Sequence, residues 1–482
     1  MLTKTITNSK TQVFKPIILL ALVLAIWILP TASSHALGLT IIQQRVLLIF
    51  IFAVIMWVTE YIPAWITSVS VTTLSLLTVS DSALNIFKAS LEGEELLSSK
   101  ALIATFADPI IFLFIGGFIL AAVASKFQID RKIANGVIGL IGTQSRYYLL
   151  GIMSVTGLCS MFISNTATAI MMLTMISPML KQMSDTDKGR TALVLGVSVA
   201  ANVGGIGTPI GTPPNAIVLK YLNDPAGMNL GIGFGDWMLV FVPFSIILIG
   251  ISWLIISKLY PFSNPEMEKV DTMQVEEKGK CDLLMKYAVY CIFGTTIALW
   301  CFDSFFGVNP NVVAFVPICL FALLGVIGKK ELAEIDWSVL WLISGGFALG
   351  LAFQESGLAH TLISGIDFSS IQPWVIIFSC WMVCWGLANV ISHTAAVTLV
   401  TPVFVVLAMS LSQELAIFGG ARTLLIGIAV FASLAMILPI STPPNALVYS
   451  TGFVQKKDLQ TVGIIIGMIG LGLSSLLVFF IR

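Results

Sequence analysis

Charge is scarce in this sequence. Only 10% of the 482 residues are Asp, Glu, Lys or Arg, whereas a soluble domain carries about 25%. The 25 basic and 25 acidic residues give a formal net charge of zero, which excludes a nucleic-acid-binding protein. Only three histidines occur, and none of the seven cysteines forms a CxxC pair. The cysteines are best explained as small residues that pack between helices.

Hydrophobic residues make up 57% of the chain, and the mean hydropathy is +0.98. Apolar runs of spanning length, or close to it, recur at 17–29, 41–58, 62–79, 110–124, 237–256, 287–306, 312–327, 340–353 and 462–481. Such runs cross a bilayer as helices, because the backbone must satisfy its own hydrogen bonds in lipid. The sequence therefore predicts an all-α polytopic membrane protein.

Positive charge predicts the orientation of the chain. The basic residues lie in clusters, and a single topology places every cluster in the cytoplasm. It has about eleven spans across the cell (inner or plasma) membrane. The N-terminus is cytoplasmic and the C-terminus lies outside. This topology requires two apolar regions, about 147–180 and 371–408, to enter and leave on the same side. We therefore expect both regions to be re-entrant hairpins.

The two hairpin regions belong to an internal repeat. Ser392 follows Ser164 by 228 residues, and Thr442 follows Thr212 by 230. The glycine pair at 345–346 likewise follows that at 116–117 by 229. Between the copies the topology has an odd number of crossings, so the copies face opposite ways. Inverted repeats of this kind are typical of secondary transporters.

The repeat predicts how the chain is divided. Residues 1–36 form an N-terminal segment and first span, 37–260 the first inverted repeat, 261–285 a cytoplasmic linker and 286–482 the second inverted repeat. Within the repeats we expect broken helices at about 191–222 and 421–450, in addition to the two hairpins.

The repeated motifs have suitable chemistry for a site in the middle of the membrane. In the stretch TPPN that begins at Thr212, the threonine suits an N-cap and Pro213 suits the first helical position. The preceding stretch, GGIGTPIG, is too rich in glycine and proline to stay helical. A helix that starts in mid-membrane presents free N–H groups and a positive dipole end, which attract anions.

These motifs resemble those of a known family, the divalent anion/sodium symporters, which carry dicarboxylates, citrate or sulfate. The resemblance rests on WVTEYIP at 57–63, SNTAT at 164–168 and the two TPPNA stretches, and it covers nearly the whole chain. It implies a homodimer, an elevator motion of a transport domain, and sodium sites beside each hairpin tip and broken helix.

The resemblance also implies roles for particular residues. Substrate carboxylates would contact Ser164, Asn165, Thr166, Thr212, Pro213, Pro214, Ser392, His393, Thr394, Thr442, Pro443 and Pro444. The first cation site would use Ser160, Ser164, Asn165 and the carbonyl of Gly211. Neutral oxygen ligands of this kind suit Na⁺, a hard cation.

The second cation site departs from the family pattern. Ala388 stands where the first repeat has Ser160, and His393 stands where it has Asn165. Two oxygen ligands are thus lost, and only the Ser441 carbonyl and its neighbours remain as ligands. One interpretation is that His393 is a neutral hydrogen-bond donor. The sharper interpretation is that an imidazolium replaces the cation, which predicts an exchanger of one anion for another. A Na⁺-coupled symporter that binds one Na⁺ at the first site is the alternative.

The predicted function is a secondary active transporter of C4–C6 di- or tricarboxylates. The partners would be these anions, the lipid bilayer and a second copy of the chain, with no cofactor other than at most one Na⁺. A sulfate transporter and an intramembrane enzyme are the weaker alternatives. An enzyme would need a nucleophile–base pair or a metal constellation, which the sequence does not offer. No G-x-x-x-x-G-K-[ST] stretch occurs, which excludes a nucleotide-driven pump.

Overall fold

The computed structural model describes residues 38–91, 93–224, 227–267, 283–365 and 370–480, together with Ala25 and Phe368. The predicted first span at 17–29, apart from Ala25, and most of the predicted linker at 261–285 lie outside these residues. The described backbone is helical apart from loops and two isolated β-bridges, which confirms the all-α fold class.

The chain divides into two compact units. Unit 1 comprises residues 1–108, 337–372 and 398–414, and unit 2 comprises 109–336, 373–397 and 415–482. The helices of unit 1 are α2 (Ile41–Thr59), α3 (Ala64–Thr78), α4 (Asn85–Lys88), α5 (Ser99–Ala104), η1 (Thr105–Ala107), α18 (Trp337–Glu355) and α19 (Leu358–Ser364). Helix α21 (His393–Ser410) begins in unit 2 and continues into unit 1, and α22 (Ser412–Leu415) lies at the boundary.

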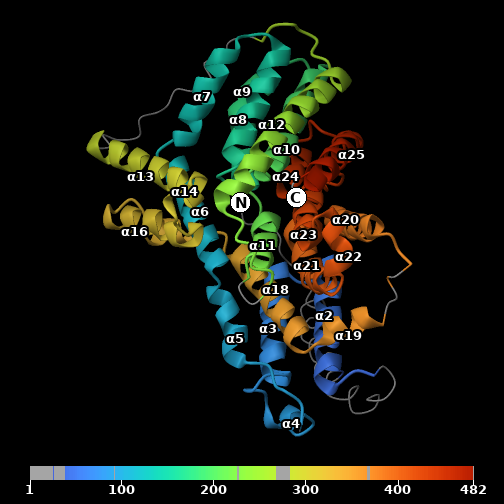
Figure 1. Cartoon of the computed structure of the whole chain (residues 1–482). Coiled ribbons are helices and arrows are strands. Elements are labelled where there is room, and N and C mark those ends of the chain that lie inside the picture. The colour runs from blue at the N-terminus through green and yellow to red at the C-terminus, as the bar shows by residue number, and fades with distance from the viewer. Residues whose placement is uncertain are drawn as a thin grey trace, which may run out of the picture. The chain divides into compact units, whose positions relative to one another are not determined.

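Unit 2 holds the remaining helices, which are shown with α21 in Figure 1. They are α6 (Pro109–Lys126), α7 (Ile129–Ile141), α8 (Ser145–Ser160), α9 (Asn165–Gln182), α10 (Lys188–Gly205), α11 (Pro213–Leu222), α12 (Phe234–Leu259), α13 (Leu283–Cys301), α14 (Asp303–Phe306), α15 (Pro310–Val313), α16 (Phe315–Leu323), α17 (Lys329–Ala333), α20 (Pro373–Val390), η2 (Ala416–Phe418), α23 (Gly420–Ser433), α24 (Pro443–Ser450) and α25 (Lys456–Phe480).

Several helices are suited to cross a membrane. Eight helices of the described chain are long and apolar enough, or up to nine if the bent pair at 412–418 and 420–433 forms one span. This number is roughly consistent with the predicted eleven, because the first predicted span is not among the described residues and other elements are shorter. Helices α20 and α21 are each long and apolar enough to cross separately, so the expected hairpin at 371–408 stays a prediction.

Corresponding elements of the two predicted repeats have similar lengths. Helices α6 and α18 contain 18 and 19 residues, and both α9 and α21 contain 18. Four residues separate the end of α8 at Ser160 from the start of α9 at Asn165. Two residues separate the end of α20 at Val390 from the start of α21 at His393. Likewise, α10 is separated from α11, and α23 from α24, by a non-helical segment. The polar, glycine or proline residues of the sequence predict each of these breaks.

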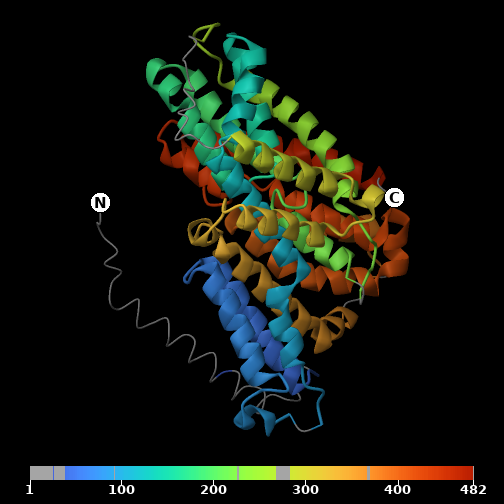
Figure 2. The same cartoon turned by 90° about the vertical axis from the view of Figure 1, so that its left-hand side faces the viewer.

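Helices α2, α3 and α18 are the main helices of unit 1. Helix α2 packs against α3, the two blue helices of Figure 2, and α3 packs closely against α18. Close packing depends on Gly345, because a Cβ there would lie 2.3 Å from the Cβ of Ser68. At the start of α2, Arg45 is fully buried and donates to the carbonyls of Thr78 (2.8 Å) and Phe87 (3.2 Å).

Helix α10 is the central helix of unit 2. It packs against α8, α9, α12 and α24, and it is buried along most of its length. Its neighbours α8, α9 and α12 lie beside it in Figure 1. The backbones of α8 and α10 meet at two glycines, since a Cβ on Gly204 would lie 2.4 Å from the carbonyl oxygen of Gly157. This helix therefore provides a rigid support for the segment that follows it.

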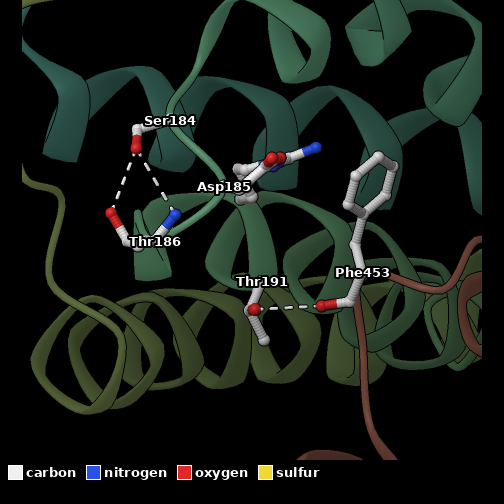
Figure 3. Close-up of polar contacts among 6 residues, drawn as sticks. Ser184, Asp185, Thr186, Thr191 and Phe453 are labelled. Carbon is white, nitrogen blue, oxygen red and sulfur yellow. Dashed lines mark hydrogen bonds and ion pairs between the residues drawn. The ribbon is translucent and has the colours of Figure 1, made fainter.

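Polar contacts join the start of α10 to the loop after α24 and lie within the loop between α9 and α10 (Figure 3). Thr191 Oγ1 donates to the carbonyl oxygen of Phe453 at 3.0 Å, and Ser184 and Thr186 share a hydrogen bond of 3.0 Å between their hydroxyls. Arg190 pairs with Asp185 and lies 4.5 Å over the ring of Phe453. These contacts connect the start of α10 to the loop between α24 and α25.

An ion pair joins the end of α6 to α17. Lys126 Nζ lies 2.6 Å from Glu331 Oε1, and the backbone N–H of Gly328 donates to the other carboxylate oxygen at 2.8 Å. The hydrogen bond from Lys126, followed by that from Gly328, lowers the pKa of Glu331 from its usual 4.5 to about 2. The pair is exposed to solvent at Lys126, so it is a minor contribution to stability.

Candidate functional site

The first predicted motif lies at the start of α9. Ser164 is the N-cap, and its Oγ accepts from the backbone N–H of Ala167 at 3.3 Å. Asn165 is the first helical residue, and Thr166 is half-buried. In the second repeat, Ser392 Oγ accepts from the N–H of Ala395 at 3.3 Å.

The second pair of predicted motifs starts α11 and α24. Thr212 is the buried N-cap of α11 and makes no side-chain capping bond there, whereas Thr442 Oγ1 accepts from the N–H of Asn445 at 3.2 Å. A proline, Pro213 or Pro443, occupies the first position of each helix, as expected from its fixed φ and missing N–H. The prolines that follow, Pro214 and Pro444, are buried, and Thr394 is half-buried.

Three of the four predicted cation ligands of the first repeat come together. One end of the Asn165 side-chain amide lies 2.6 Å from Ser160 Oγ, 3.1 Å from the carbonyl oxygen of Gly211 and 3.3 Å from that of Ala201. Ser160 Oγ itself donates to the carbonyl oxygen of Ala201 at 2.8 Å. The amide nitrogen occupies this end, because only a donor satisfies neighbours that all accept. Ser164 is not one of these hydrogen-bond partners, and its Oγ accepts from the N–H of Ala167 instead.

A missing side chain leaves room for this cluster. A Cβ on Gly205 would lie 2.7 and 3.0 Å from the two terminal atoms of the Asn165 amide and 3.0 Å from the carbonyl oxygen of Gly211. These separations are shorter than ordinary van der Waals contact. No pattern in the sequence distinguishes Gly205 from its neighbours, since only the folded segment shows which glycine faces Asn165.

The corresponding group of the second repeat is arranged differently. Ala388 is fully buried and has no hydroxyl, and His393 Nε2 forms a 2.7 Å hydrogen bond with the carbonyl oxygen of Ala435. Ser441 Oγ donates to the carbonyl oxygen of Asn389 at 2.9 Å and accepts from the N–H of Leu438 at 3.2 Å. The polar atoms here are thus largely paired with one another.

Side-chain donors satisfy the carbonyls where α10 ends. Asn215 Nδ2 donates to the carbonyl oxygens of Gly205 (3.1 Å), Ile206 (3.2 Å) and Thr208 (2.8 Å). Trp237 Nε1 donates to the Ile206 oxygen at 2.9 Å. A helix that ends inside the protein leaves carbonyls without intrahelical partners, so these donors hold the break in shape.

The common substrate pocket that the four motifs would line stays a prediction. An open cavity of about 720 Å³, lined by residues that include Gln144, Arg146 and Glu266, contains none of the predicted site residues. Within the described ranges, no three His, Cys, Asp or Glu side chains gather where they could hold a metal ion. The oxygen group around Asn165 is, by its neutral oxygens, suited to a hard cation rather than to a transition metal.

The fold and this site define a class, a multi-pass helical membrane protein in which helices break at polar motifs that recur in two halves of the chain. A sequence model of the citrate transporter family matches residues 89–418, more than half of the chain, so the protein belongs to that family. Membership of a family of anion transporters confirms the resemblance drawn from the motifs.

Named relatives agree with this assignment. The sodium-dependent dicarboxylate transporter SdcS of Staphylococcus aureus strain USA300 is 28% identical over 467 residues, which cover 90% of this chain and 86% of that protein. The protein of the same name from strain NCTC 8325 is matched to the same extent. Among solved structures, the Alcanivorax borkumensis YdaH transporter covers 79% of this chain and 86% of its own, with a TM-score of 0.56 and 14% identity. That likeness concerns the fold alone.

Proposed function

We propose that this protein is a secondary transporter that carries small di- or tricarboxylates together with Na⁺, and that Na⁺ binds in the first repeat. Membership of the citrate transporter family supports transport of carboxylates. The name of the relative SdcS supports dicarboxylates and Na⁺ in particular. The protein is proposed to be a transporter and not an enzyme.

The surroundings of the Asn165 amide carry this proposal. Its nitrogen end faces three oxygens, those of Ser160, Gly211 and Ala201, at 2.6–3.3 Å. Rotation of the amide by 180° would replace this donor with an oxygen, so four neutral oxygens would be neighbours. The Ser160 hydroxyl has one proton and can satisfy only one of them, so a cation would compensate the others, and neutral oxygens suit a hard cation. Asn165 can thus serve as a donor without Na⁺ and as a ligand with it.

The proposed substrate site uses the starts of four helices. Helices α9 and α21 start at Ser-Asn-Thr and Ser-His-Thr, and α11 and α24 start at Thr-Pro-Pro. The starts of α9 and α21 offer backbone N–H groups, whereas prolines remove the first two N–H groups of α11 and α24. All four helix starts present the positive end of a dipole, worth about 0.3–1 kcal/mol per helix toward an anion at an exposed site. Two carboxylates could thus be bound by hydroxyls, amides and helix termini, without a lysine or arginine.

The architecture that accompanies this function is also part of the proposal. The two repeats would be inverted in the membrane, with hairpins at 147–180 and 371–408 that open to opposite sides. Two protomers would form a homodimer in the cell membrane, and an elevator motion would move the substrate. The N-terminus would lie in the cytoplasm and the C-terminus outside.

Exchange of anions is the second candidate, and the second repeat favours it. Ala388 lacks the hydroxyl of Ser160, and the ring of His393 is bonded to the Ala435 carbonyl where an Asn amide would stand. An imidazolium there would supply a fixed positive charge, and the empty carrier would then be costly to move. Because the first group keeps Ser160, Asn165 and Gly211 together, we place Na⁺ coupling first.

Uptake into proteoliposomes tests both candidates. The purified full-length chain is reconstituted, and uptake of labelled succinate, malate, 2-oxoglutarate, citrate and sulfate is measured with Na⁺ or K⁺ outside. A Na⁺-coupled carrier fills empty vesicles only when Na⁺ is outside. An exchanger requires vesicles preloaded with anion and responds equally in Na⁺ and K⁺. The absence of uptake of any carboxylate in either arm would contradict the proposed transporter.

A further inference from the structure

The asparagine that ends each TPPN motif donates hydrogen bonds to backbone carbonyls of the helix break in both repeats. Asn215 Nδ2 donates to three carbonyls of the first break, and Asn445 Nδ2 donates to the carbonyl oxygens of Met436 (2.9 Å) and Leu438 (3.0 Å) in the second. Each asparagine therefore ties the start of the shorter half-helix to the end of the longer one.

The side-chain oxygens of these two asparagines differ. Asn445 Oδ1 accepts from Ser198 Oγ at 2.5 Å and from Asn202 Nδ2 at 3.1 Å, and all three residues are buried. Asn215 Oδ1 is buried and has no hydrogen-bond partner among the described residues. The positions of the second repeat that correspond to Ser198 and Asn202 are Ile428 and Ala432, which have no donor. In the part of the chain that the structure describes, side-chain hydrogen bonds thus join a TPPN asparagine to the other repeat in one direction only, from α10 to α24.

The same part of α10 belongs to the proposed cation site. The carbonyl oxygen of Ala201, one residue before Asn202, lies 2.8 Å from Ser160 Oγ and 3.3 Å from the Asn165 amide. On the other side of the link, Thr442 Oγ1 accepts from the N–H of Asn445. Two hydrogen-bonded steps thus lead from the cation site to the helix start that is proposed to face the substrate.

We propose that Ser198, Asn202 and Asn445 are positioning residues that couple Na⁺ binding in the first repeat to substrate binding at α24. This inference rests on the proposed function. Na⁺ at the Ala201 carbonyl fixes the end of α10, and the side chains of Ser198 and Asn202 then fix Asn445 and the start of α24. A buried donor–acceptor pair cannot part without a large free-energy penalty, so the two ends are held to compatible positions.

The coupling between two ligands can be measured as a ratio of two affinities. The coupling factor is the affinity for the dicarboxylate in Na⁺ divided by that in choline, and thermodynamic linkage requires the same factor for Na⁺ affinity with and without dicarboxylate. A residue that merely stabilises the fold lowers both affinities or the melting temperature and leaves this ratio unchanged. The ratio therefore separates a coupling role from a structural one.

The experiment compares two buried serines in the purified full-length protein. Ser198→Ala removes the donor to Asn445, while the control Ser252→Ala removes a hydroxyl that donates only to its own helix, to the carbonyl of Leu248 at 2.7 Å. Calorimetry measures the affinity for succinate in Na⁺ and in choline, and for Na⁺ with and without succinate. We expect the coupling factor to fall roughly threefold to tenfold in Ser198→Ala, the range for one hydrogen bond, and to stay unchanged in the control.

A second variant and the wild type complete the test. Asn202→Ala removes the other donor and should lower the factor in the same direction, even if Ser198→Ala fails to fold. An unchanged factor in both variants, or a fall as large in Ser252→Ala, would overturn the coupling role while Na⁺ dependence stands. A wild-type factor of one would instead contradict Na⁺ coupling itself, and the inference with it.

Discussion

Removal of the Ser160 hydroxyl should weaken Na⁺ binding without unfolding the protein. In Ser160→Ala, the Asn165 amide keeps its contacts with the carbonyls of Gly211 and Ala201, at 3.1 and 3.3 Å. Two hydrogen bonds are lost, the one to the Ala201 carbonyl and the one from the Asn165 amide, so the free energy of unfolding should fall by about 2 kcal/mol. Toward a bound cation, however, the variant lacks one of four neutral oxygens.

The expected loss of Na⁺ affinity can be estimated from the energy of a contact between a neutral polar group and an ion. An interaction between a polar group and an ion contributes about 1.5–3 kcal/mol, which corresponds to a roughly 10- to 150-fold weaker affinity for Na⁺. The assay is the dependence of the melting temperature on Na⁺ concentration, with choline to keep the ionic strength constant.

The matched control lies one turn earlier on the same helix. Thr156 is fully buried, and its hydroxyl donates at 2.6 Å to the carbonyl of Ile152 within α8. Thr156→Val removes this hydroxyl without a change of shape and should leave the Na⁺ response intact. If Ser160→Ala responds to Na⁺ within about twofold of Thr156→Val, the placement of the cation beside Ser160 is wrong, since the expected loss from one ligand is larger.

Three further changes probe other parts of the molecule. Gly205→Ala should abolish the stabilisation by Na⁺, because the added methyl enters the oxygen group. The control Gly250→Ala, at a helical glycine whose Cβ would have nothing within 4 Å, should keep the stabilisation by Na⁺. Equal Na⁺ responses of the two variants would count against the site. The double change Ala388→Ser with His393→Asn should add a second Na⁺-binding event in a titration; a titration curve identical to the wild type would remove His393 as the reason for a single site. Because the pKa of Glu331 is lowered to about 2, its stabilising effect is present above about pH 4.5 and lost as the pH falls toward 2. The melting temperature of Glu331→Gln should therefore decline less between pH 6 and pH 3 than that of the wild type, and parallel declines would refute the role of the pair.

The positions at which helices start and stop can be predicted from the sequence. The stretch TPPN predicts an N-cap at Thr212, and Thr212 is the N-cap of α11, although its side chain makes no capping bond. Pro213 is expected at the first helical position and lies there. These features are local, because a cap or a proline acts within one turn of the residue itself.

The partners of the broken helices cannot be predicted in the same way. The carbonyl of Ile206 receives a hydrogen bond from Trp237, and Asn445 receives one from Ser198, 247 residues away in the chain. The burial of Arg45 is equally hidden in the sequence, because the three groups that bind its guanidinium lie in later segments. Such contacts depend on how distant helices pack, and no periodicity in the sequence reports them.

The number of Na⁺ ions that accompany each substrate tests the central claim most directly. Vesicles that hold the full-length protein and no internal anion are given ²²Na⁺ and ¹⁴C-labelled succinate, and the initial rates of both fluxes are measured together. We expect one Na⁺ to enter with each dicarboxylate, and the Na⁺ flux to depend on succinate. Succinate uptake without any Na⁺ flux, or uptake only into anion-loaded vesicles, would contradict a Na⁺-coupled carrier with its cation in the first repeat.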